Sequence, residues 1–250
     1  FFDDISPNKN VINLINYCSH TIIKGELYYP MVFEYSEYGD LFEVINKLKM
    51  DKSLVISIFN QILNGVNHLN KYGWAHRDIK MENILVTNLN PVQVKVIDFE
   101  YATKNKYSKF QTGTLCYMSP EILKNEKYNT MKNDVWALGI ILFTLYTGKM
   151  PYRKTFIDDK TNFICERLLA IKEKKWINYW LSIENCCKNI IDKSLLDDGK
   201  FDIDFKILIQ KMLSWNESDR ISLAKIINHP FLNNKVYNKE KPSCLCCTII

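Results

Sequence analysis

The chain has 250 residues, of which 47% are hydrophobic and 24% are charged. This length can bury a sizeable core and allows one large domain or two lobes, and the composition is that of a soluble globular protein. The net charge is +5, but the basic residues are scattered, whereas a nucleic-acid surface concentrates them, so we expect no nucleic-acid partner.

The eight cysteines do not form the two C-x-x-C pairs typical of a zinc site, and they are few for a disulfide scaffold of this length. We therefore expect reduced thiols and a cytoplasmic location. No apolar run approaches the roughly 20 residues that span a bilayer, and no signal peptide opens the chain. The first residue is Phe1 rather than Met, which suggests a fragment, a processed product or an incomplete gene model.

Residues 1–35 resemble the remains of a β-sheet. Two stretches rich in β-forming residues, 10–14 and 26–35, are separated by a turn near Lys24 and Gly25. By itself the second stretch indicates no more than a plain buried strand.

Two helices are predicted next. Residues 39–48 have apolar side chains at helical spacing, with Asp40 as the N-cap residue. From Asp51 to Tyr72 apolar residues recur every three or four positions, which predicts a long core helix ended by Gly73.

Further along, residues 92–97 alternate between apolar and polar and predict a half-buried strand. A helix starting at Asp134 and ending at Gly148 is apolar on nearly all sides and must be central. A later segment contains Trp176 and Trp180 at helical spacing.

The most informative stretch lies at residues 76–83, which read HRDIKMEN. Asp78 can accept a hydroxyl proton, Lys80 supplies a cation and Asn83 supplies an amide oxygen, a set that suits a phosphate-and-metal site. Asp98, which opens the letters DFE, completes the set. The alternative is a polar turn between a helix and a strand. The pattern resembles the catalytic and metal-binding motifs of the eukaryotic protein kinases, H-R-D-x-K-x-x-N followed by D-F-G.

The resemblance covers roughly residues 8–233 and implies an α+β, protein-kinase-like fold: a mainly helical C-terminal lobe with a partial N-terminal β-lobe. Residues 1–35 would be the residual small lobe and the approach to the hinge. Residues 36–233 would be the large lobe, with an insertion within about 153–204, and residues 234–250 a flexible Cys-rich tail.

The resemblance also implies catalytic roles. Asp78 would orient the acceptor hydroxyl and take its proton, and Lys80 would offset charge on the transferred phosphoryl group. Thr114, in the GTLCYMSPE of residues 113–121, would hydrogen-bond to both. Lys80 and Thr114 at these places resemble the serine/threonine kinases.

ATP and Mg²⁺ are the implied ligands. Asn83 and Asp98 would hold the metal. The nucleotide would contact five residues: Phe33 at the back of the adenine pocket, backbone groups of Glu34 and Ser36 at the adenine edge, Asp40 near the ribose or a basic substrate residue, and Leu85 as the floor.

The sequence departs from the family pattern in two ways. It contains no G-x-G-x-x-G loop and no V-A-I-K-like strand, so we assign no residue to the lysine that holds the α- and β-phosphates. Glu100 also stands where the family has Gly. Either its backbone stays in an ordinary region, or metal binding is altered.

Several supporting contacts are implied as well. We expect Glu121 to form a buried ion pair with Arg220, Asp134 to cap the catalytic-loop backbone, and Phe99 to pack against His76.

Arg77 implies control by a phosphate on the segment that follows Asp98. Ser108 and Thr112 are the candidate carriers. Because Phe110 occupies the place where several relatives carry the phosphorylated Thr, ordering of the segment without phosphate stays an equal alternative.

The last four residues, Cys247 to Ile250, fit the C-a-a-X prenylation pattern, and Cys244 and Cys246 could be acylated beside it. This predicts membrane association through a lipidated tail. The alternative is a disordered tail that happens to be rich in Cys.

The sequence therefore predicts a serine/threonine protein kinase that transfers the ATP γ-phosphoryl group to Ser or Thr hydroxyls of a protein substrate, in a chain lacking the Gly-rich loop and strand Lys. The main alternative is a pseudokinase that acts as a binding scaffold. A nucleic-acid-binding module has only the +5 charge to support it.

Overall fold

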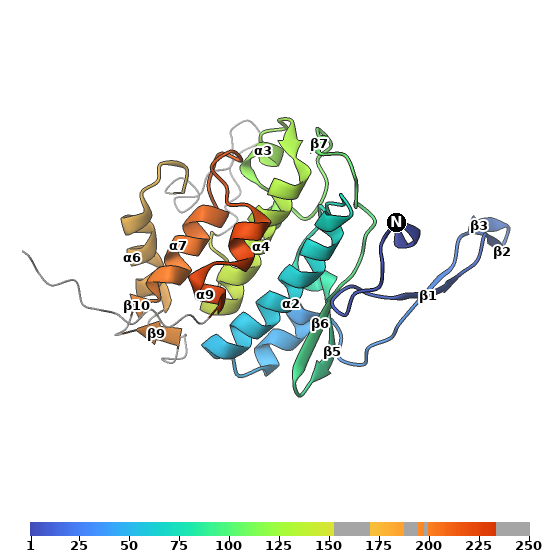
Figure 1. Cartoon of the computed structure of the whole chain (residues 1–250), viewed down its shortest axis with the longest axis horizontal. Coiled ribbons are helices and arrows are strands. Elements are labelled where there is room, and N and C mark those ends of the chain that lie inside the picture. Colours follow the sequence, from blue (N-terminus) through green and yellow to red (C-terminus); the bar gives the residue numbers. More distant parts are fainter. Residues whose placement is uncertain (153–170, 188–194, 198–199, 234–250) are drawn as a thin grey trace, which may run out of the picture.

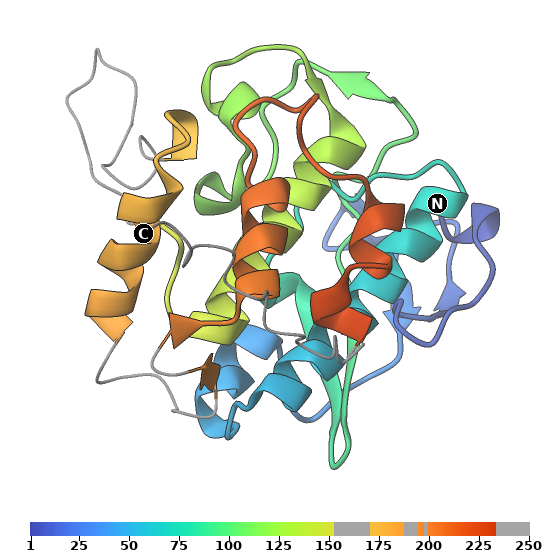
Figure 2. The same ribbon diagram turned by 60° about the vertical axis from the view of Figure 1, so that its left-hand side comes forward.

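The computed structural model describes residues 1–152, 171–187, 195–197 and 200–233. A helical body forms most of the molecule, and a narrow β-ribbon built from residues 14–33 projects from it (Figure 1). Seen from two directions, helix α6 (Trp176–Cys187) and the ribbon lie on opposite sides of the body (Figure 2). This is the predicted arrangement of a helical lobe with a partial β-lobe.

Helix α4 (Thr130–Thr147) is the centre of the body, because all its residues except Met131 and Lys132 are buried. The helix begins one turn earlier than predicted, since the side chain of Asn129 accepts a hydrogen bond from the Lys132 N–H at 3.1 Å and caps it. It ends at Gly148, whose φ of 66° places it in the left-handed region that favours glycine.

Helix α2 (Lys52–Lys71) packs against α4 and confirms the predicted core helix. Asp51 accepts a hydrogen bond from the Leu54 N–H at 2.7 Å, and Gly73 follows the helix with a φ of 81°. The shorter helix α1 (Leu41–Val44) is capped by Asp40 as predicted, but it continues only as a 3-10 turn over Ile45–Lys47.

The remaining elements of the body are short. A hairpin of β5 (Ile84–Leu89) and β6 (Val92–Val96) pairs Ile84 with Val96. The others are β7 (Tyr107–Ser108), α3 (Pro120–Leu123), β8 (Tyr128–Asn129), β9 (Leu196–Asp197), β10 (Lys200–Phe201), α7 (Ile203–Met212), α8 (Leu223–Ile227) and α9 (Pro230–Asn233).

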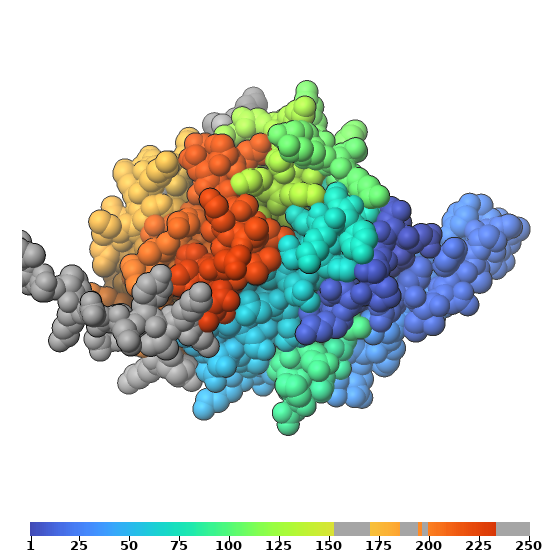
Figure 3. Space-filling model, in the orientation of Figure 1, coloured from blue at the N-terminus to red at the C-terminus, as the bar shows by residue number. Residues whose placement is uncertain are grey.

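The β-ribbon contains two strand pairs. Strand β1 (Leu14–Tyr17) pairs with β4 (Met31–Phe33), and β2 (Thr21–Ile23) pairs with β3 (Glu26–Tyr28) across the predicted turn. Both pairs are antiparallel. In the space-filling view the ribbon stands out from the body (Figure 3). Its exposed large apolar side chains are Ile15, Tyr17, Ile22, Ile23, Leu27, Tyr28, Tyr29, Met31 and Val32.

The predicted strand over residues 10–14 is wrong, because only Leu14 belongs to a ribbon strand. The residues before it join the body. The Ile12 N–H donates to the Val96 carbonyl at 3.0 Å, and the Val96 N–H donates to the Asn10 carbonyl at 2.9 Å. Burial of Asn10 and Val11 against β6 therefore outweighs pairing within the ribbon.

Part of the predicted insertion and the whole Cys-rich tail lie outside the described residues, including the predicted lipidation site at Cys247 with Cys244 and Cys246. Within the part that the structure describes, no helix is long and apolar enough to cross a membrane.

Candidate active site

Asp134 on α4 holds the loop that follows α2, at His76 and Arg77, by hydrogen bonds to its backbone. The two carboxylate oxygens accept hydrogen bonds from the backbone N–H groups of His76 and Arg77, each at 2.8 Å. Burial raises the pKa of Asp134 to about 7, although these two hydrogen bonds oppose the shift. The predicted backbone cap is present.

His76 is fully buried and joins this loop to the one after β6. Its Nε2 lies 2.9 Å from the Ile97 carbonyl, and the Asp78 N–H donates to its Nδ1 at 3.3 Å. These partners fit a neutral ring protonated on Nε2. Burial lowers the pKa of His76. The Phe99 ring lies 5.2 Å from the His76 ring, as predicted.

Asp78 is 5% exposed and gathers the other predicted catalytic residues around its carboxylate. Lys80 Nζ lies 2.8 Å from Oδ2, and the Thr114 hydroxyl and N–H lie 3.1 and 2.9 Å from Oδ1. Lys80 Nζ also lies 3.0 Å from the Thr114 hydroxyl. Asp78, Lys80 and Thr114 therefore form one cluster, although Thr114 comes from a separate segment.

Lys80 is held as an ammonium in this cluster. Partial burial disfavours the charge, but the hydrogen bond and charge of Asp78, aided by the charges of Glu82 and Asp98, outweigh burial and raise the pKa of Lys80. A positive charge is thus fixed beside Asp78.

The residues predicted to hold a metal lie on neighbouring turns. The Asn83 amide nitrogen donates to the Asp78 carbonyl at 2.9 Å and to Asp78 Oδ2 at 3.1 Å, which commits its nitrogen and leaves its oxygen available as a ligand. The Ile97 N–H donates to the Asn83 carbonyl at 3.0 Å, so Asp98, with its exposed side chain, emerges next to Asn83.

One amide oxygen and one carboxylate are the hard donors that Mg²⁺ takes together with phosphate and water. Among the described residues no group of three or more His, Cys, Asp or Glu side chains could hold a metal. If Asn83 and Asp98 hold a Mg²⁺ ion, phosphate and water oxygens would complete its coordination.

The backbone of Glu100 stays in an ordinary region, so the first of the two alternatives for this position holds. Its N–H donates to Asp98 Oδ1 at 3.4 Å. The described non-glycine residues with a positive φ are Lys24, Arg77, Asp98, Asn125 and Lys174, and Glu100 is not among them. The strained residue of this turn is therefore Asp98, with a φ of 62°, and Glu100 needs no glycine-like conformation.

Phe33 and Glu34 lie at the end of β4, on the approach to the hinge. The Phe33 ring is half-buried and lies 5.5 Å from the ring of Phe2. The Glu34 carboxylate pairs with Lys95 Nζ at 2.6 Å and accepts the Asn13 N–H at 2.8 Å. The Glu34 N–H is engaged as well, because it donates to the Asn13 carbonyl at 3.3 Å. The predicted backbone contact with an adenine would therefore fall to the Glu34 carbonyl.

The other three predicted nucleotide contacts surround the start of β5. The Ser36 hydroxyl donates to the Val86 carbonyl. Asp40 accepts the Glu43 N–H at 2.9 Å as N-cap of α1 and forms a β-bridge with Leu85. The five predicted nucleotide-contact residues therefore lie together on the β4–α1 connection and β5. Their role toward a nucleotide stays a prediction.

Arg77 reaches the segment after Asp98, but its guanidinium contacts neutral acceptors. Nε lies 3.2 Å from the Tyr128 hydroxyl, and the other nitrogens lie 3.4 Å from the Tyr101 carbonyl, the Phe110 carbonyl and the Ser108 hydroxyl. The candidate phosphate carrier Ser108 therefore does lie at Arg77. Thr112 instead lies 3.4 Å from the Tyr128 hydroxyl.

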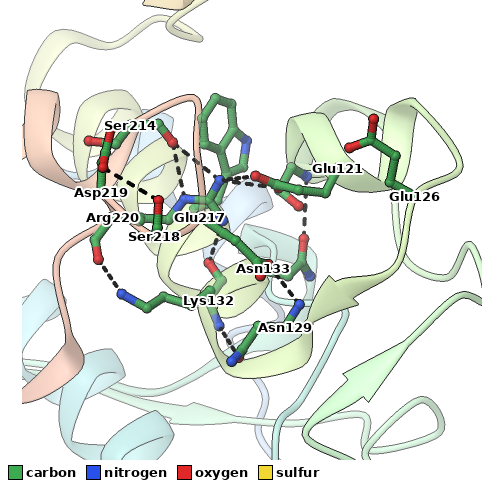
Figure 4. Close-up of polar contacts among 12 residues, drawn as sticks. Glu121, Glu126, Asn129, Lys132, Asn133, Ser214, Glu217, Ser218, Asp219 and Arg220 are labelled. Atoms are coloured by element: carbon green, nitrogen blue, oxygen red, sulfur yellow. Dashed lines mark hydrogen bonds and ion pairs between the residues drawn. The ribbon is translucent and has the colours of Figure 1, made fainter.

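Glu121 on α3 and Arg220 form the predicted ion pair, and both residues are buried (Figure 4). Arg220 Nη2 lies 2.9 and 3.1 Å from the two carboxylate oxygens, Nη1 donates to the Lys132 carbonyl at 3.0 Å, and Nε donates to the Ser214 carbonyl at 3.3 Å. The guanidinium also lies 5.1 Å from the Trp136 ring centroid. The Arg220 guanidinium thus has three hydrogen-bonding partners and one aromatic neighbour.

Two groups of contacts had no signal in the sequence. Phe1 stacks on Phe99 at 4.4 Å and Phe2 lies 5.5 Å from the same ring, so the first residues extend the His76–Phe99 contact toward the ribbon. No periodicity marks two residues at the start of a chain. The second is the contact of Tyr128 with Arg77, which joins residues fifty-one positions apart.

A buried carboxylate beside a fixed ammonium, with amide and carboxylate donors on adjoining turns, defines a site suited to phosphoryl transfer. Comparison with known proteins agrees. The protein kinase domain family matches residues 2–232, and the chain therefore belongs to the eukaryotic serine/threonine protein kinase family.

Three relatives illustrate the similarity. "Probable serine/threonine-protein kinase HSL1" of Saccharomyces cerevisiae is 31% identical over 229 residues, which cover 87% of this chain and 13% of the relative. Serine/threonine-protein kinase SAPK1 of Oryza sativa subsp. japonica is 29% identical over 209 residues, 82% of this chain and 55% of the relative. DNA damage response protein kinase DUN1 of S. cerevisiae is 30% identical over 251 residues, which cover 91% of this chain and 44% of the relative. The chain thus spans roughly half or less of the curated relatives it matches.

Proposed function

We propose that this chain is the catalytic part of a serine/threonine protein kinase that transfers the γ-phosphoryl group of ATP to a Ser or Thr hydroxyl of a protein substrate. One observation carries the proposal. The Asp78 carboxylate is buried and shared between Lys80 and Thr114. A binding scaffold has no need of an ammonium and a hydroxyl converging on one carboxylate.

In the reaction, the acceptor hydroxyl oxygen forms a bond to the γ-phosphorus while the bond from the γ-phosphorus to the bridging oxygen breaks, and ADP leaves. Asp78 orients the hydroxyl and receives its proton. Lys80 offsets negative charge on the phosphoryl oxygens, and Thr114 holds the opposite oxygen of Asp78 in place. These contributions are positioning and charge stabilisation, which dominate in phosphoryl transfer.

Mg²⁺ held by Asn83 and Asp98 would supply further neutralisation of phosphate charge. The Asn83 amide is oriented for this by its two hydrogen bonds to Asp78. Metal binding and proton transfer are therefore linked in this proposal. Asp78 orients the Asn83 amide that would bind the metal, and Asp78 also receives the proton.

The test compares phosphate incorporation into a protein substrate by the full-length protein and by Asp78→Asn. We expect the variant to lose transfer by several orders of magnitude. Asp51→Asn is the matched control, since Asp51 only caps α2 and Asn caps helices equally well. Equal incorporation by wild type and Asp78→Asn would remove the proposed mechanism.

A pseudokinase scaffold is the second candidate, favoured by the missing Gly-rich loop and strand Lys within these 250 residues. For the same reason we expect the isolated 250-residue chain to bind ATP weakly and to transfer little phosphate. A nucleotide titration checks this. Micromolar affinity would contradict it, and a full-length protein that binds ATP without transfer would favour the scaffold.

A further inference from the structure

Glu217 lies in the loop between α7 and α8, far from Asp78 in sequence and half-buried. Its Oε2 accepts a hydrogen bond from the backbone N–H of Asn129 at 2.8 Å (Figure 4). Asn129 is the last residue of β8 and also caps α4 through its own side chain. The Glu217 carboxylate therefore fixes the backbone at the junction of β8 and α4.

This carboxylate is placed among positive charges. Arg220 and Lys132 lie near it, and Lys132 Nζ donates to the Arg220 carbonyl (Figure 4). Burial and the charge of Arg220 lower the pKa of Lys132, and the charge of Glu217 opposes that shift. Glu121 already pairs with Arg220, so the Glu217 carboxylate is not needed to neutralise the arginine. Its direct contact is instead the Asn129 N–H.

The junction matters because β8 pairs with β7 in the segment after Asp98. The register places Ser108 opposite Tyr128 and Tyr107 opposite Asn129. Tyr128 is 1% exposed, and its hydroxyl donates to the Phe110 carbonyl at 3.0 Å and contacts Arg77 Nε at 3.2 Å. Displacement of β8 would therefore move the contacts of both Arg77 and Phe110.

From Phe110 the chain needs only four residues to reach the catalytic cluster. Gly113, with a φ of 94°, lies so close to Arg77 that an added Cβ would be 2.6 Å from the Arg77 carbonyl oxygen. Thr114 then hydrogen-bonds to Asp78. The path from Glu217 to Asp78 thus runs through partly buried hydrogen bonds and one tight backbone contact.

We propose that Glu217 is a positioning residue for the candidate active site: its carboxylate, by accepting the Asn129 N–H, holds Tyr128 against Arg77 and Phe110 so that Thr114 reaches Asp78. This inference rests on the proposed kinase function for its catalytic consequence. The ordering of residues 105–112 does not depend on catalysis and can be measured separately.

The experiment compares Glu217→Ala, Glu217→Gln and Asp219→Ala in the full-length protein. Glu217→Ala removes the acceptor, whereas Glu217→Gln keeps an acceptor oxygen and removes only the charge. Asp219→Ala is the matched control, because Asp219 lies in the same loop with an exposed side chain and contacts Ser218 and Lys174.

Hydrogen exchange over residues 105–112 and 128–130 is the first readout. We expect Glu217→Ala to accelerate exchange there by about fivefold, the factor for losing one hydrogen bond, without a uniform change elsewhere. Glu217→Gln and Asp219→Ala should stay within about twofold of wild type. Uniform acceleration across the chain, or equal effects of Glu217→Gln and Glu217→Ala, would overturn the proposal.

Transfer kinetics are the second readout. Glu217→Ala should lower kcat by about fivefold and leave the KM for ATP unchanged, with recovery in Glu217→Gln. Tyr128→Phe keeps the buried ring and removes the hydroxyl, so adding Glu217→Ala to it should lower kcat little further. Full additivity would overturn the path through Tyr128. If the wild type transfers no phosphate, the proposed function fails, while the exchange readout still decides the role of Glu217.

Discussion

Asp134 holds Arg77 in a conformation that arginine rarely adopts. The Arg77 N–H donates to Asp134 Oδ1 at 2.8 Å, and Arg77 has a φ of 72°. A left-handed backbone at a residue with a long side chain costs about 1–3 kcal/mol and persists only where surrounding contacts fix it. The buried carboxylate on α4 therefore maintains the strained turn that presents Asp78.

Asp134→Asn should lower the free energy of unfolding by about 1–3 kcal/mol at pH 8, where Asp134 is ionised. Asn supplies one acceptor oxygen where the carboxylate supplies two, so its amide group would face either the His76 or the Arg77 N–H. Urea denaturation followed by fluorescence measures the change.

Asp51→Asn serves as the control for this substitution. Asp51 also accepts a backbone N–H, but from one donor at a helix N-terminus, where Asn is equally suitable. It should change the free energy of unfolding by a few tenths of a kcal/mol. Equal effects of the two substitutions would show that Asp134 does not maintain the turn.

The contribution of His76 to stability should depend on pH. Because burial depresses its pKa in the folded state, the unfolded chain binds the proton more tightly. The stability from His76 is complete above pH 6.5 and is lost as pH falls below it, by at most about 1.4 kcal/mol per pH unit. His76→Phe should lack this component.

The measurement is the difference in unfolding free energy between wild type and His76→Phe from pH 5 to pH 8. Burial also raises the pKa of Asp134 and lowers the pKa of His229. Both residues are present in both proteins, so their contributions cancel in the difference. The difference should rise up to about pH 6.5 and then stay level. Parallel curves for the two proteins would contradict a neutral buried His76.

Local signals in the sequence predicted the parts of the site that one loop supplies. In residues 76–83 the letters alone placed Asp78, Lys80 and Asn83 together, because a short loop cannot separate them far. The resemblance added Thr114 and the Glu121–Arg220 pair, which no local pattern could join across up to ninety-nine positions.

The predictions failed where tertiary contacts replaced local preference. Residues 10–12 have β-forming character, but they pair with Val96 in the body. The apolar run that begins at Asp134 predicts a helix start there, whereas Asn129 caps α4 a turn earlier. The contact of Tyr128 with Arg77 had no local signal, because it joins residues fifty-one positions apart.

Glu100→Gly should destabilise the protein by about 0.5–1 kcal/mol and should not strengthen metal binding. The Glu100 backbone is outside the left-handed region, so Gly would relieve no strain and would only add freedom to the unfolded chain. Gly113→Ala is the contrasting variant, because a Cβ there meets the Arg77 carbonyl at 2.6 Å and should cost more. A gain in stability for Glu100→Gly, measured by thermal unfolding, would refute this prediction.

Arg220→Met should cost about 3–5 kcal/mol, because it leaves the Glu121 carboxylate buried without its partner. Pairing it with Glu121→Met removes that stranded charge, so the double variant should be more stable than the sum of the two single changes predicts. The Lys132 and Ser214 carbonyls still lose their donors, so recovery should be partial. A double-mutant cycle in urea measures the coupling.

An exposed pair on the neighbouring surface provides the control for this cycle. Lys124 and Glu126 lie 3.8 Å apart with both side chains largely in solvent (Figure 4 labels Glu126), and such pairs contribute about 0–1 kcal/mol. Glu126→Ala should therefore change stability by less than about 0.5 kcal/mol. If the cycle at Glu121 and Arg220 gives strict additivity, the burial of this pair does not stabilise the junction of α3 with the loop before α8.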